Sequence, residues 1–280
     1  MSRASRLLDE IYEFFNPHVS TGVVIRGNAD DVGHVKEQWF PHSPLRGTTI
    51  DRAMGAAREA QTHLARIGEQ MAEHVIELDP NYPPEKYHFR KRPSLAAHPI
   101  KGLTFVNPGV KLDRDRIRDK ANKRGGIEKV TDLTRGSFLV DHPNTAGRIT
   151  KELGKHFAVA DEDWFQRPEG YGDKALQLRF PSGMIGEMQI LHPAMYKAKM
   201  GEGHRLYNQT KAPGISPQRK KHLTEQMINV YRQAVSRYSP AWRKAFGITM
   251  PGRLALKAAS ETGLASCHTS TQSISSHFGG

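Results

Sequence analysis

The stretch Thr131-Asp-Leu-Thr-Arg-Gly-Ser-Phe-Leu-Val-Asp141 decides the fold of this chain. Its apolar second half predicts a buried strand over residues 137–141, and Asp132 stands shortly before that strand. A second apolar stretch, Met184-Ile-Gly-Glu-Met-Gln-Ile-Leu191, predicts another buried strand with Glu187 inside it. A carboxylate in such a strand needs a partner, because burying an unpaired charge is costly. The two strands therefore indicate a candidate site with one acid on each.

The residues around these two strands predict alternating helices and strands between positions 101 and 212. The expected elements are helices over 113–123, 145–153 and 193–207 and strands over 137–141, 156–160, 176–180 and 184–191. The turn Pro181-Ser-Gly183 predicts that the last two strands form an antiparallel hairpin. The expected fold class is α+β, close to α/β, with a mixed, mostly antiparallel sheet flanked by helices.

The flanks of that core are expected to be helical or irregular. Apolar residues recur at helical spacing over 7–15 and again from Thr49 to Leu78, whereas residues 17–47 show little periodicity. A proline-rich stretch with basic residues over 80–100 is typical of a linker. The expected regions are an N-terminal helical and irregular region over 1–100, a core domain over 101–212, a basic C-terminal region over 213–259 with a helix over 216–238, and a disordered tail over 260–280.

Charge and cysteine content limit the class of protein. The 280 residues include 41 Lys and Arg against 29 Asp and Glu, a net charge of +12 that favours nucleotides, nucleic acids or an anionic membrane surface as partners. A soluble protein with a merely basic surface is the alternative. The single cysteine, Cys267, excludes an internal disulfide and a cysteine-based zinc site. Without a signal peptide or an apolar run near the roughly 20 residues of a membrane span, we expect no membrane partner and a cytoplasmic location, either in the producing cell or in a target cell into which the protein is delivered.

Asp132 and Glu187 have the chemistry of a magnesium–nucleotide site. Magnesium bound to a nucleoside polyphosphate takes one or two protein carboxylates and keeps several waters. The two acids could supply that pair if their strands are neighbours. Taken singly, Asp132 could be an ordinary turn residue, and Glu187 could pair with an arginine of a helix. Their occurrence together on the two most apolar strands favours the metal site.

Basic side chains gather on the expected helix over 113–123. They are Lys111, Arg114, Arg116, Arg118, Lys120, Lys123 and Arg124. Like charges one turn apart destabilise a helix. The neighbouring aspartates offset part of this repulsion, and we expect a bound anion to offset the rest. Arginine gives bidentate contacts to phosphate and lysine a mobile point charge, which suits a polyphosphate. A solvated charged helix is the alternative.

Tyr171 lies between Gly170 and Gly172, in the turn before the hairpin. The two glycines predict a tight turn that leaves the ring exposed. An exposed aromatic ring beside a phosphate site would give a purine base a surface for stacking. A tyrosine that packs the end of the hairpin is the alternative.

In this order, these pieces resemble the RelA/SpoT-type alarmone synthetase domain. The resemblance covers about residues 105–210 and is carried by positions 111–120, 132–136, 170–173 and 187–190 and by Met195, His204 and Tyr207. It implies a nucleotidyltransferase-like synthetase fold. It also implies transfer of pyrophosphate from ATP to the 3′-hydroxyl of a guanine nucleotide. Toxin members of this fold act on adenine nucleotides or on the 3′ end of tRNA.

The resemblance implies a role for each candidate residue. Asp132 and Glu187 would be catalytic and would bind Mg²⁺, with Glu187 accepting the proton of the attacking hydroxyl. The substrate-binding residues would be Lys111, Arg114, Arg116, Lys120, Arg135, Tyr171, Gln189 and His204. Among these, Lys111, Arg116 and Lys120 would lie along the ATP, and Tyr171 would stack on the acceptor base.

Several positions depart from the family's pattern. Asp173 and Ala175 stand where the family has Ser and His, Leu191 stands where it has Arg, and Arg135 comes early. These departures favour a toxin-like or effector-like branch that acts on a purine nucleotide or tRNA and is neutralised by an antitoxin or immunity protein. An inactive nucleotide- or RNA-binding module of the same fold and a different nucleotidyltransferase are the alternatives. Retention of both carboxylates argues against the inactive module.

Overall fold

A computed structural model of the protein describes residues 24–27, 29–78, 89–107 and 113–248. The expected helix over 7–15, the tail over 260–280 and Lys111 lie outside these ranges. The described residues up to Phe246 belong to one compact unit. Within the described ranges, no helix combines the length and the apolar character needed to cross a membrane.

A mixed sheet forms the centre of the fold, with the strand order β1-β6-β8-β9-β5-β4-β2-β3 and a short β7 paired to β8. Its strands are β1 (Val24–Gly27), β2 (Ala72–Leu78), β3 (Phe89–Pro93), β4 (Ile100–Asn107), β5 (Arg135–Val140), β6 (Ala158–Glu162), β7 (Phe165–Gln166), β8 (Gly172–Arg179) and β9 (Ile185–Leu191). The pairs β1–β6, β2–β4 and β5–β9 are parallel and the other five are antiparallel. The expected fold class, a mixed and mostly antiparallel sheet flanked by helices, is therefore confirmed.

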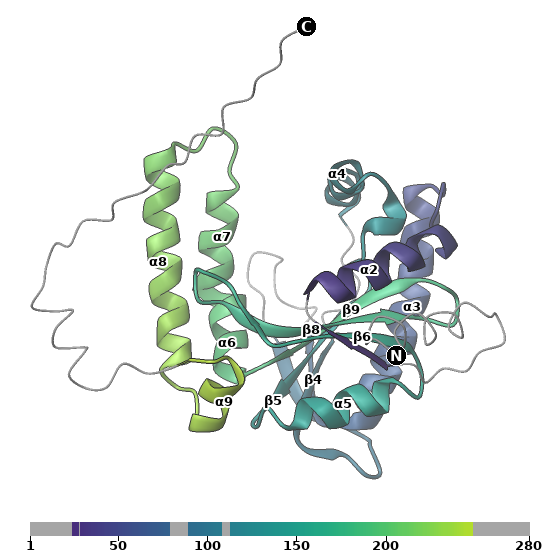
Figure 1. Ribbon diagram of the computed structural model, residues 1–280, viewed down its shortest axis with the longest axis horizontal. Helices are drawn as coiled ribbons and strands as arrows, with labels where there is room; N and C mark the ends of the chain where they lie inside the picture. Colours follow the sequence, from purple (N-terminus) through teal and green to yellow (C-terminus); the bar gives the residue numbers. More distant parts are fainter. Residues whose placement is uncertain (1–23, 28, 79–88, 108–112, 249–280) are drawn as a thin grey trace, which may run out of the picture. The chain divides into compact units, whose positions relative to one another are not determined.

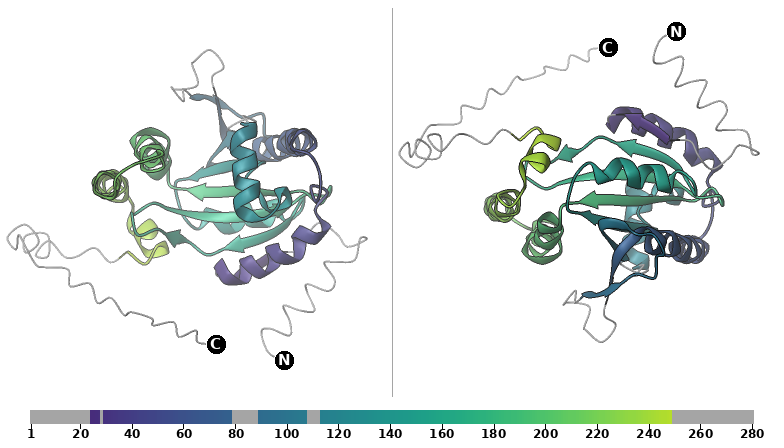
Figure 2. Two further views of the ribbon diagram at one scale, coloured as in Figure 1. Left: turned by 90° about the horizontal axis from the view of Figure 1, so that it is seen from above. Right: turned by 90° about the horizontal axis from the view of Figure 1, so that it is seen from below.

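Helices cover the sheet on both sides. They are α2 (Ala29–Trp39), α3 (Ile50–Met71), α4 (Arg114–Arg124), α5 (Thr145–Leu153), α6 (Pro193–Ala198), α7 (His204–Thr210), α8 (Pro217–Val235) and α9 (Pro240–Ala245). Figure 1 shows α2 and α4 on one side of the strands and α5 on the other. Helices α7 and α8 contact each other, and both views of Figure 2 show them side by side.

The two strands that carry the expected carboxylates are neighbours. β5 and β9 run parallel, with Arg135 opposite Glu187. The expected antiparallel hairpin of β8 and β9 is also present, with Gln177 opposite Glu187, and its turn places Gly183 at a φ of 80°. Since successive side chains of a strand point to opposite faces, Arg135, Glu187 and Gln177 share one face. Asp173, Ala175 and Gln189 lie on the same face, at the matching positions of β8 and β9.

The opposite face of the sheet is apolar and packs against α3. Phe138, Met188 and Ile190 point to it and are fully buried. Gly68 of α3 lies so close to Phe105 that a Cβ there would be 2.6 Å from the ring. Burial of each such large side chain stabilises the fold by about 1.5–3 kcal/mol. This core fixes the sheet whose polar face carries the carboxylates.

The N-terminal region departs from the sequence prediction. The long helix expected up to Leu78 ends at Met71, and Ala72–Leu78 is strand β2 between β3 and β4. The apolar spacing of Val75 and Leu78 fits a helix. Val75 is nevertheless buried in the sheet, so pairing with β3 and β4 determines that residues 72–78 form a strand. The stretch 17–47, whose sequence shows little periodicity, includes β1 and α2. The region before residue 101 thus supplies strands to the sheet.

Candidate active site

Asp132 and Glu187 lie on two segments that are far apart in sequence and adjacent in space. Asp132 stands in the turn three residues before β5, not on the strand itself, and Glu187 lies in the middle of β9. The backbone N–H of Glu187 donates to the carbonyl oxygen of Thr134 at 2.9 Å, which ties β9 to the turn that carries Asp132. The Asp132 charge is one of the groups that raise the pKa of Glu187. The structure thus brings together the two carboxylates that the sequence singled out.

The Asp132 carboxylate is surrounded by cations of α4. The Lys120 ammonium donates to Oδ2, and the Arg124 guanidinium lies 3.9 Å from Oδ1. Burial raises the pKa of Asp132, but the hydrogen bond with Lys120 and the charges of Lys120, Arg124 and Arg135 outweigh it, so this pKa lies below its usual value. Oδ1 is buried without a hydrogen bond. One oxygen of Asp132 is thus held by lysine and the other can accept a ligand.

Helix α4 holds its basic residues in place through its two ends and one apolar anchor. The Asp113 side chain caps the first turn, and Gly125 ends the helix in the left-handed region at a φ of 78°. Ile117 is the buried residue of the helix. Lys120 turns to Asp132, whereas Arg114 pairs with Asp51 of α3 at 2.7 Å, with both side chains exposed. Arg114 is therefore engaged by α3, away from the carboxylate pair.

The Glu187 carboxylate has a different environment. Burial raises its pKa, Asp132 and Asp173 raise it further, and Lys199 and Arg135 partly oppose them, so that the net pKa is raised. Among the residues that the structure describes, none makes an ion pair or hydrogen bond with this carboxylate. A carboxylate with a raised pKa is the better acceptor of a proton in catalysis near neutral pH.

Lys199 is a site residue that the sequence analysis missed. It begins the π-helical turn Lys199–Gly203 after α6, and its ammonium donates to Oε1 of Gln189. The ammonium also lies 5.3 Å from the centre of the Tyr171 ring. Burial lowers the pKa of Lys199, and the charges of Asp173 and Glu187 oppose that shift. One signal existed: Lys197 and Lys199 are two apart on a helix, so they point to nearly opposite sides of it, and one of those sides is the more favourable for a contact with the sheet.

The expectation that the Tyr171 ring is exposed is wrong. The residue is 9% exposed, and its ring packs on Tyr231 of α8 with the centroids 5.6 Å apart. Its hydroxyl donates to Oδ2 of Asp173 at 2.8 Å. The glycine turn is present, with Gly170 at a φ of 90°, but a helix some 60 positions later covers the ring. Local turn residues cannot predict such a cover.

His204 and Arg135 complete the polar face. His204 begins α7; burial lowers its pKa, and the charges of Arg116, Arg135 and Lys199 lower it further. Helices α4 and α7, the π-helical turn after α6, and strands β5 and β9 thus direct side chains to one region. Gln189, Arg116, Lys120 and Arg135 are among the expected substrate-binding residues that lie there.

Gln61 of α3 is the second residue that the sequence analysis missed. It is 3% exposed, and its amide both donates to the Arg135 carbonyl and accepts from the Arg135 N–H, each at 3.0 Å. It also donates to Oδ1 of Asn107 at 3.1 Å. Gln61 therefore fixes the start of β5 beside Asp132. A polar residue on the apolar stripe of a helix is the signal that could have indicated it.

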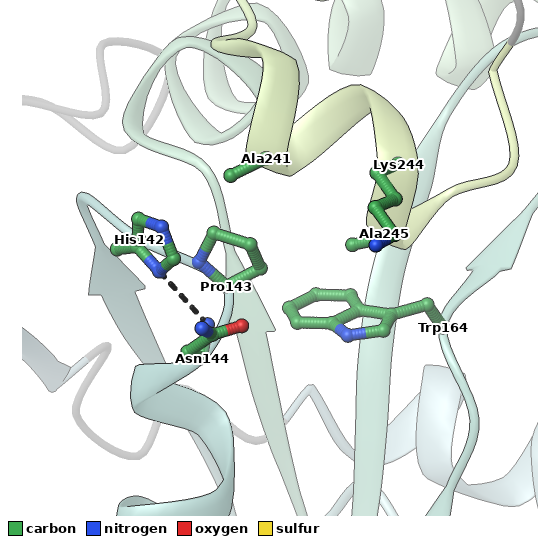
Figure 3. Close-up of a pocket in the computed structure, with 7 residues that line it drawn as sticks. All are labelled: His142, Pro143, Asn144, Trp164, Ala241, Lys244 and Ala245. Carbon is green, nitrogen blue, oxygen red and sulfur yellow. Dashed lines mark hydrogen bonds between the residues drawn. The ribbon is translucent and has the colours of Figure 1, made fainter.

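A pocket of about 480 Å³ lies elsewhere, beside α9. Figure 3 shows the indole ring of Trp164 between α9 and the turn formed by His142, Pro143 and Asn144, with Lys244 above it. No carboxylate lines this pocket, and none of the expected site residues contributes to it. It follows the end of β5, whereas Asp132 precedes the start of that strand.

The polar face of the sheet suits a charged, oxygen-rich substrate. Cations of α4 meet one carboxylate, and the second carboxylate is half-buried and within reach of the charges of Lys199 and Asp173. Among the described residues, no group of three or more His, Cys, Asp and Glu side chains is arranged to hold a metal ion.

Comparison with solved structures finds matches at low similarity. No protein-family model and no curated protein matches the sequence. The type VI effector Tas1, solved with its immunity protein, is 16% identical with a TM-score of 0.42 and covers 67% of this chain and 96% of its own. A GTP pyrophosphokinase family protein from Streptococcus pneumoniae is 18% identical (TM-score 0.36; 72% and 95% covered). Small alarmone synthetase 1 from Bacillus subtilis bound to pppGpp is 17% identical (TM-score 0.31; 50% and 81% covered). At this level of similarity, the solved structures indicate no substrate for this chain.

Proposed function

We propose that this protein is an ATP-dependent pyrophosphokinase that transfers pyrophosphate to the 3′-hydroxyl of a purine nucleotide or of an RNA such as tRNA. The supporting observation is the pair formed by Asp132, in the turn before β5, and Glu187, in the neighbouring parallel strand β9, with the cations of α4 on the Asp132 side. The motif order resembling the RelA/SpoT-type synthetase domain supports the same assignment.

In the proposed reaction, the acceptor's hydroxyl oxygen attacks the β-phosphorus of ATP. A new O–P bond forms, the bond from the β-phosphorus to the α,β-bridging oxygen breaks, and AMP leaves. Glu187 takes the hydroxyl proton, which its raised pKa favours. Arg116, Lys120 and Arg135 offset the charge of the polyphosphate, since phosphoryl transfer depends on positioning and charge neutralisation.

Magnesium fits the carboxylate pair. The buried Oδ1 of Asp132 has no hydrogen bond, and Glu187 lies close enough for the two charges to interact. Two carboxylates are what magnesium takes from a protein when ATP and water supply its other ligands. The ion would neutralise charge on the transferred group when bound. Asp132 would be its principal protein ligand and would keep Lys120 beside the polyphosphate.

One observation favours the alternative of an inactive nucleotide- or RNA-binding module. The ring of Tyr171, expected to stack on the acceptor base, is covered by Tyr231. A different nucleotidyltransferase is the other alternative, because it would use the same carboxylates. These alternatives differ in which phosphate of ATP, if any, is transferred to the acceptor.

The deciding experiment uses ATP labelled at the γ-phosphate in one series and at the α-phosphate in another. Each is incubated with Mg²⁺, the protein and GDP, GTP, ADP, ATP or bulk tRNA. We expect the γ-label and not the α-label to appear on one acceptor. Transfer of the α-label would indicate a nucleotidyltransferase, and ATP binding without any transfer would indicate a binding module; either result overturns the proposal. Lys244→Ala, in the pocket beside α9, is the matched control and should behave as the wild type.

A toxin or effector role is part of the same proposal. Asp173, Ala175 and Leu191 depart from the residues of the resembling housekeeping enzymes, which suits a toxin that consumes ATP or blocks tRNA. Induced expression in bacteria should then arrest growth with the wild type and not with Glu187→Gln at equal protein levels. An antitoxin or immunity protein is the partner that this role implies. Equal growth of the two strains would contradict the toxin role, and the transferase assignment would still stand.

A further inference from the structure

Lys199 stands at the centre of the Glu187 side of the site. Its backbone N–H is shared between the carbonyls of Met195 and Tyr196 at the end of α6, where the π-helical turn begins. Such turns insert a residue into a helix and are frequent at functional sites. The ammonium consequently reaches Gln189 of β9 instead of solvent.

The residue opposite Gln189 on β8 is small. Ala175 lies directly opposite Gln189 in the β8–β9 ladder. Directly opposed residues have their Cβ atoms about 4.5–5.5 Å apart, so a larger side chain at 175 would press on the Gln189 amide. With a methyl group there, Lys199 takes the amide oxygen.

The partners of Lys199 are all groups of the Glu187 side. Asp173 and Glu187 face its charge, and the Tyr171 ring lies beneath it at 5.3 Å. Tyr171 in turn donates to Asp173. On the remaining sides, Arg135 and Arg167 add positive charge. Lys199 thus links the Gln189 amide, an aromatic ring and two carboxylates that come from separate strands and turns.

We propose that Lys199 is the positioning residue for the acceptor, and this inference rests on the proposed pyrophosphokinase function. Lys199 holds the oxygen of the Gln189 amide, which leaves both amide N–H donors of Gln189 for a ligand. The acceptor group that fits is rich in oxygen, such as a ribose hydroxyl or a phosphate. Lys199 thereby places that group next to Glu187, and Asp132 with α4 serves the ATP.

The test compares Lys199→Met, which keeps the length of the stem, with Lys197→Met on the same helix, where the side chain is exposed. ATP affinity is measured without acceptor, and transfer is measured with the acceptor that the labelled panel identifies. We expect the Kd for ATP to stay within about twofold and kcat/KM for the acceptor to fall about 10- to 100-fold in Lys199→Met, because small misplacements of a reacting group cost that much. Lys197→Met should match the wild type.

A double-mutant cycle separates positioning from a structural role. If Lys199 acts through Gln189, the variant with both Lys199→Met and Gln189→Ala should be no slower than the slower single variant. Lys199→Arg, which keeps a cation, should recover part of the rate. If Lys199→Met does not fold, Ala175→Leu fills the space beside Gln189 and should lower acceptor kcat/KM with ATP affinity intact.

Three results would overturn the role of Lys199. They are wild-type transfer by Lys199→Met, additive effects in the cycle, and an equal loss of ATP affinity and transfer. Absence of transfer by the wild type itself would be a different failure, because it removes the proposed function and the role of Lys199 with it.

Discussion

The two carboxylates of the site lie on adjoining segments yet have opposite electrostatic environments. Asp132 is held by Lys120 and lies near Arg124, and its pKa is lowered. Glu187 is half-buried, and its desolvation together with the charges of Asp132 and Asp173 raises its pKa. Neighbouring acids whose pKa values are shifted in opposite directions can take different roles. One stays ionised throughout the reaction, and the other accepts a proton. The difference teaches that the neighbours of each acid, and not the residue type, assign its role.

Glu187→Gln should have the largest effect on activity. Loss of the proton acceptor should lower kcat about 100- to 10,000-fold, the range for general acid–base catalysis. Because burial raises the pKa of Glu187, folding disfavours its ionised form, and at neutral pH the neutral amide should leave the Tm unchanged or higher. Rate and thermal unfolding are measured beside Glu225→Gln, an exposed control. A stable variant with wild-type transfer would remove Glu187 from the mechanism.

Asp132→Asn should lower activity and stability together, unlike the change at Glu187. Transfer should fall about 100- to 1,000-fold through loss of charge stabilisation. The lowered pKa means that ionised Asp132 stabilises the fold above its unfolded pKa and that this contribution is lost as pH falls through the folded pKa. The free energy of unfolding at pH 7 should therefore drop, by about 1–2 kcal/mol, with little difference from the wild type in strong acid. Urea unfolding across pH, with the exposed Asp119→Asn as control, measures this. An equal Tm at pH 7 would contradict the pairing with Lys120.

Gln61→Ala should destabilise the start of β5 beside Asp132, although Gln61 itself is not among the expected substrate-binding residues. The change leaves the N–H and carbonyl of Arg135 without their partner, which costs about 1–3 kcal/mol of unfolding free energy. Transfer should fall less than in either acid variant, since Asp132 and Glu187 remain. Urea unfolding with the exposed Gln70→Ala of the same helix as control tests this. Equal stability of the two variants would mean that β5 starts correctly without Gln61.

Asp173→Asn should have the smallest effect and should act on the Glu187 side alone. Asp173 is one of the charges that raise the pKa of Glu187, so its removal should lower that pKa. The acid limb of the kcat/KM profile should therefore move to lower pH, and the rate at neutral pH should change little. The Tyr171 hydroxyl can still donate to the amide oxygen that replaces the carboxylate. An unmoved acid limb, with the exposed Asp163→Asn as control, would show that Glu187 does not set this limb.

The sequence predicted four of the nine strands of the described sheet and part of the site. The hairpin of β8 and β9, the helix α4 and the fold class follow from local periodicity and turn residues, and the structure confirms them. The end of α3 at Met71 could not be predicted, because the apolar residues of β2 also fit a helical spacing. The roles of Asp132 and Glu187 remain predictions, although the structure brings the two acids together.

The sequence by itself determined which chemistry is available. It supplied two acids next to apolar strands, a helix dense in cations and a net charge of +12, all of which are local properties of the chain. Only the tertiary structure decided how these parts act on one another. It paired β5 with β9, covered Tyr171 with α8, and turned Lys199 inward to Gln189. These outcomes depend on contacts between residues far apart in the chain, and burial and neighbouring charge then set the opposite pKa shifts of Asp132 and Glu187.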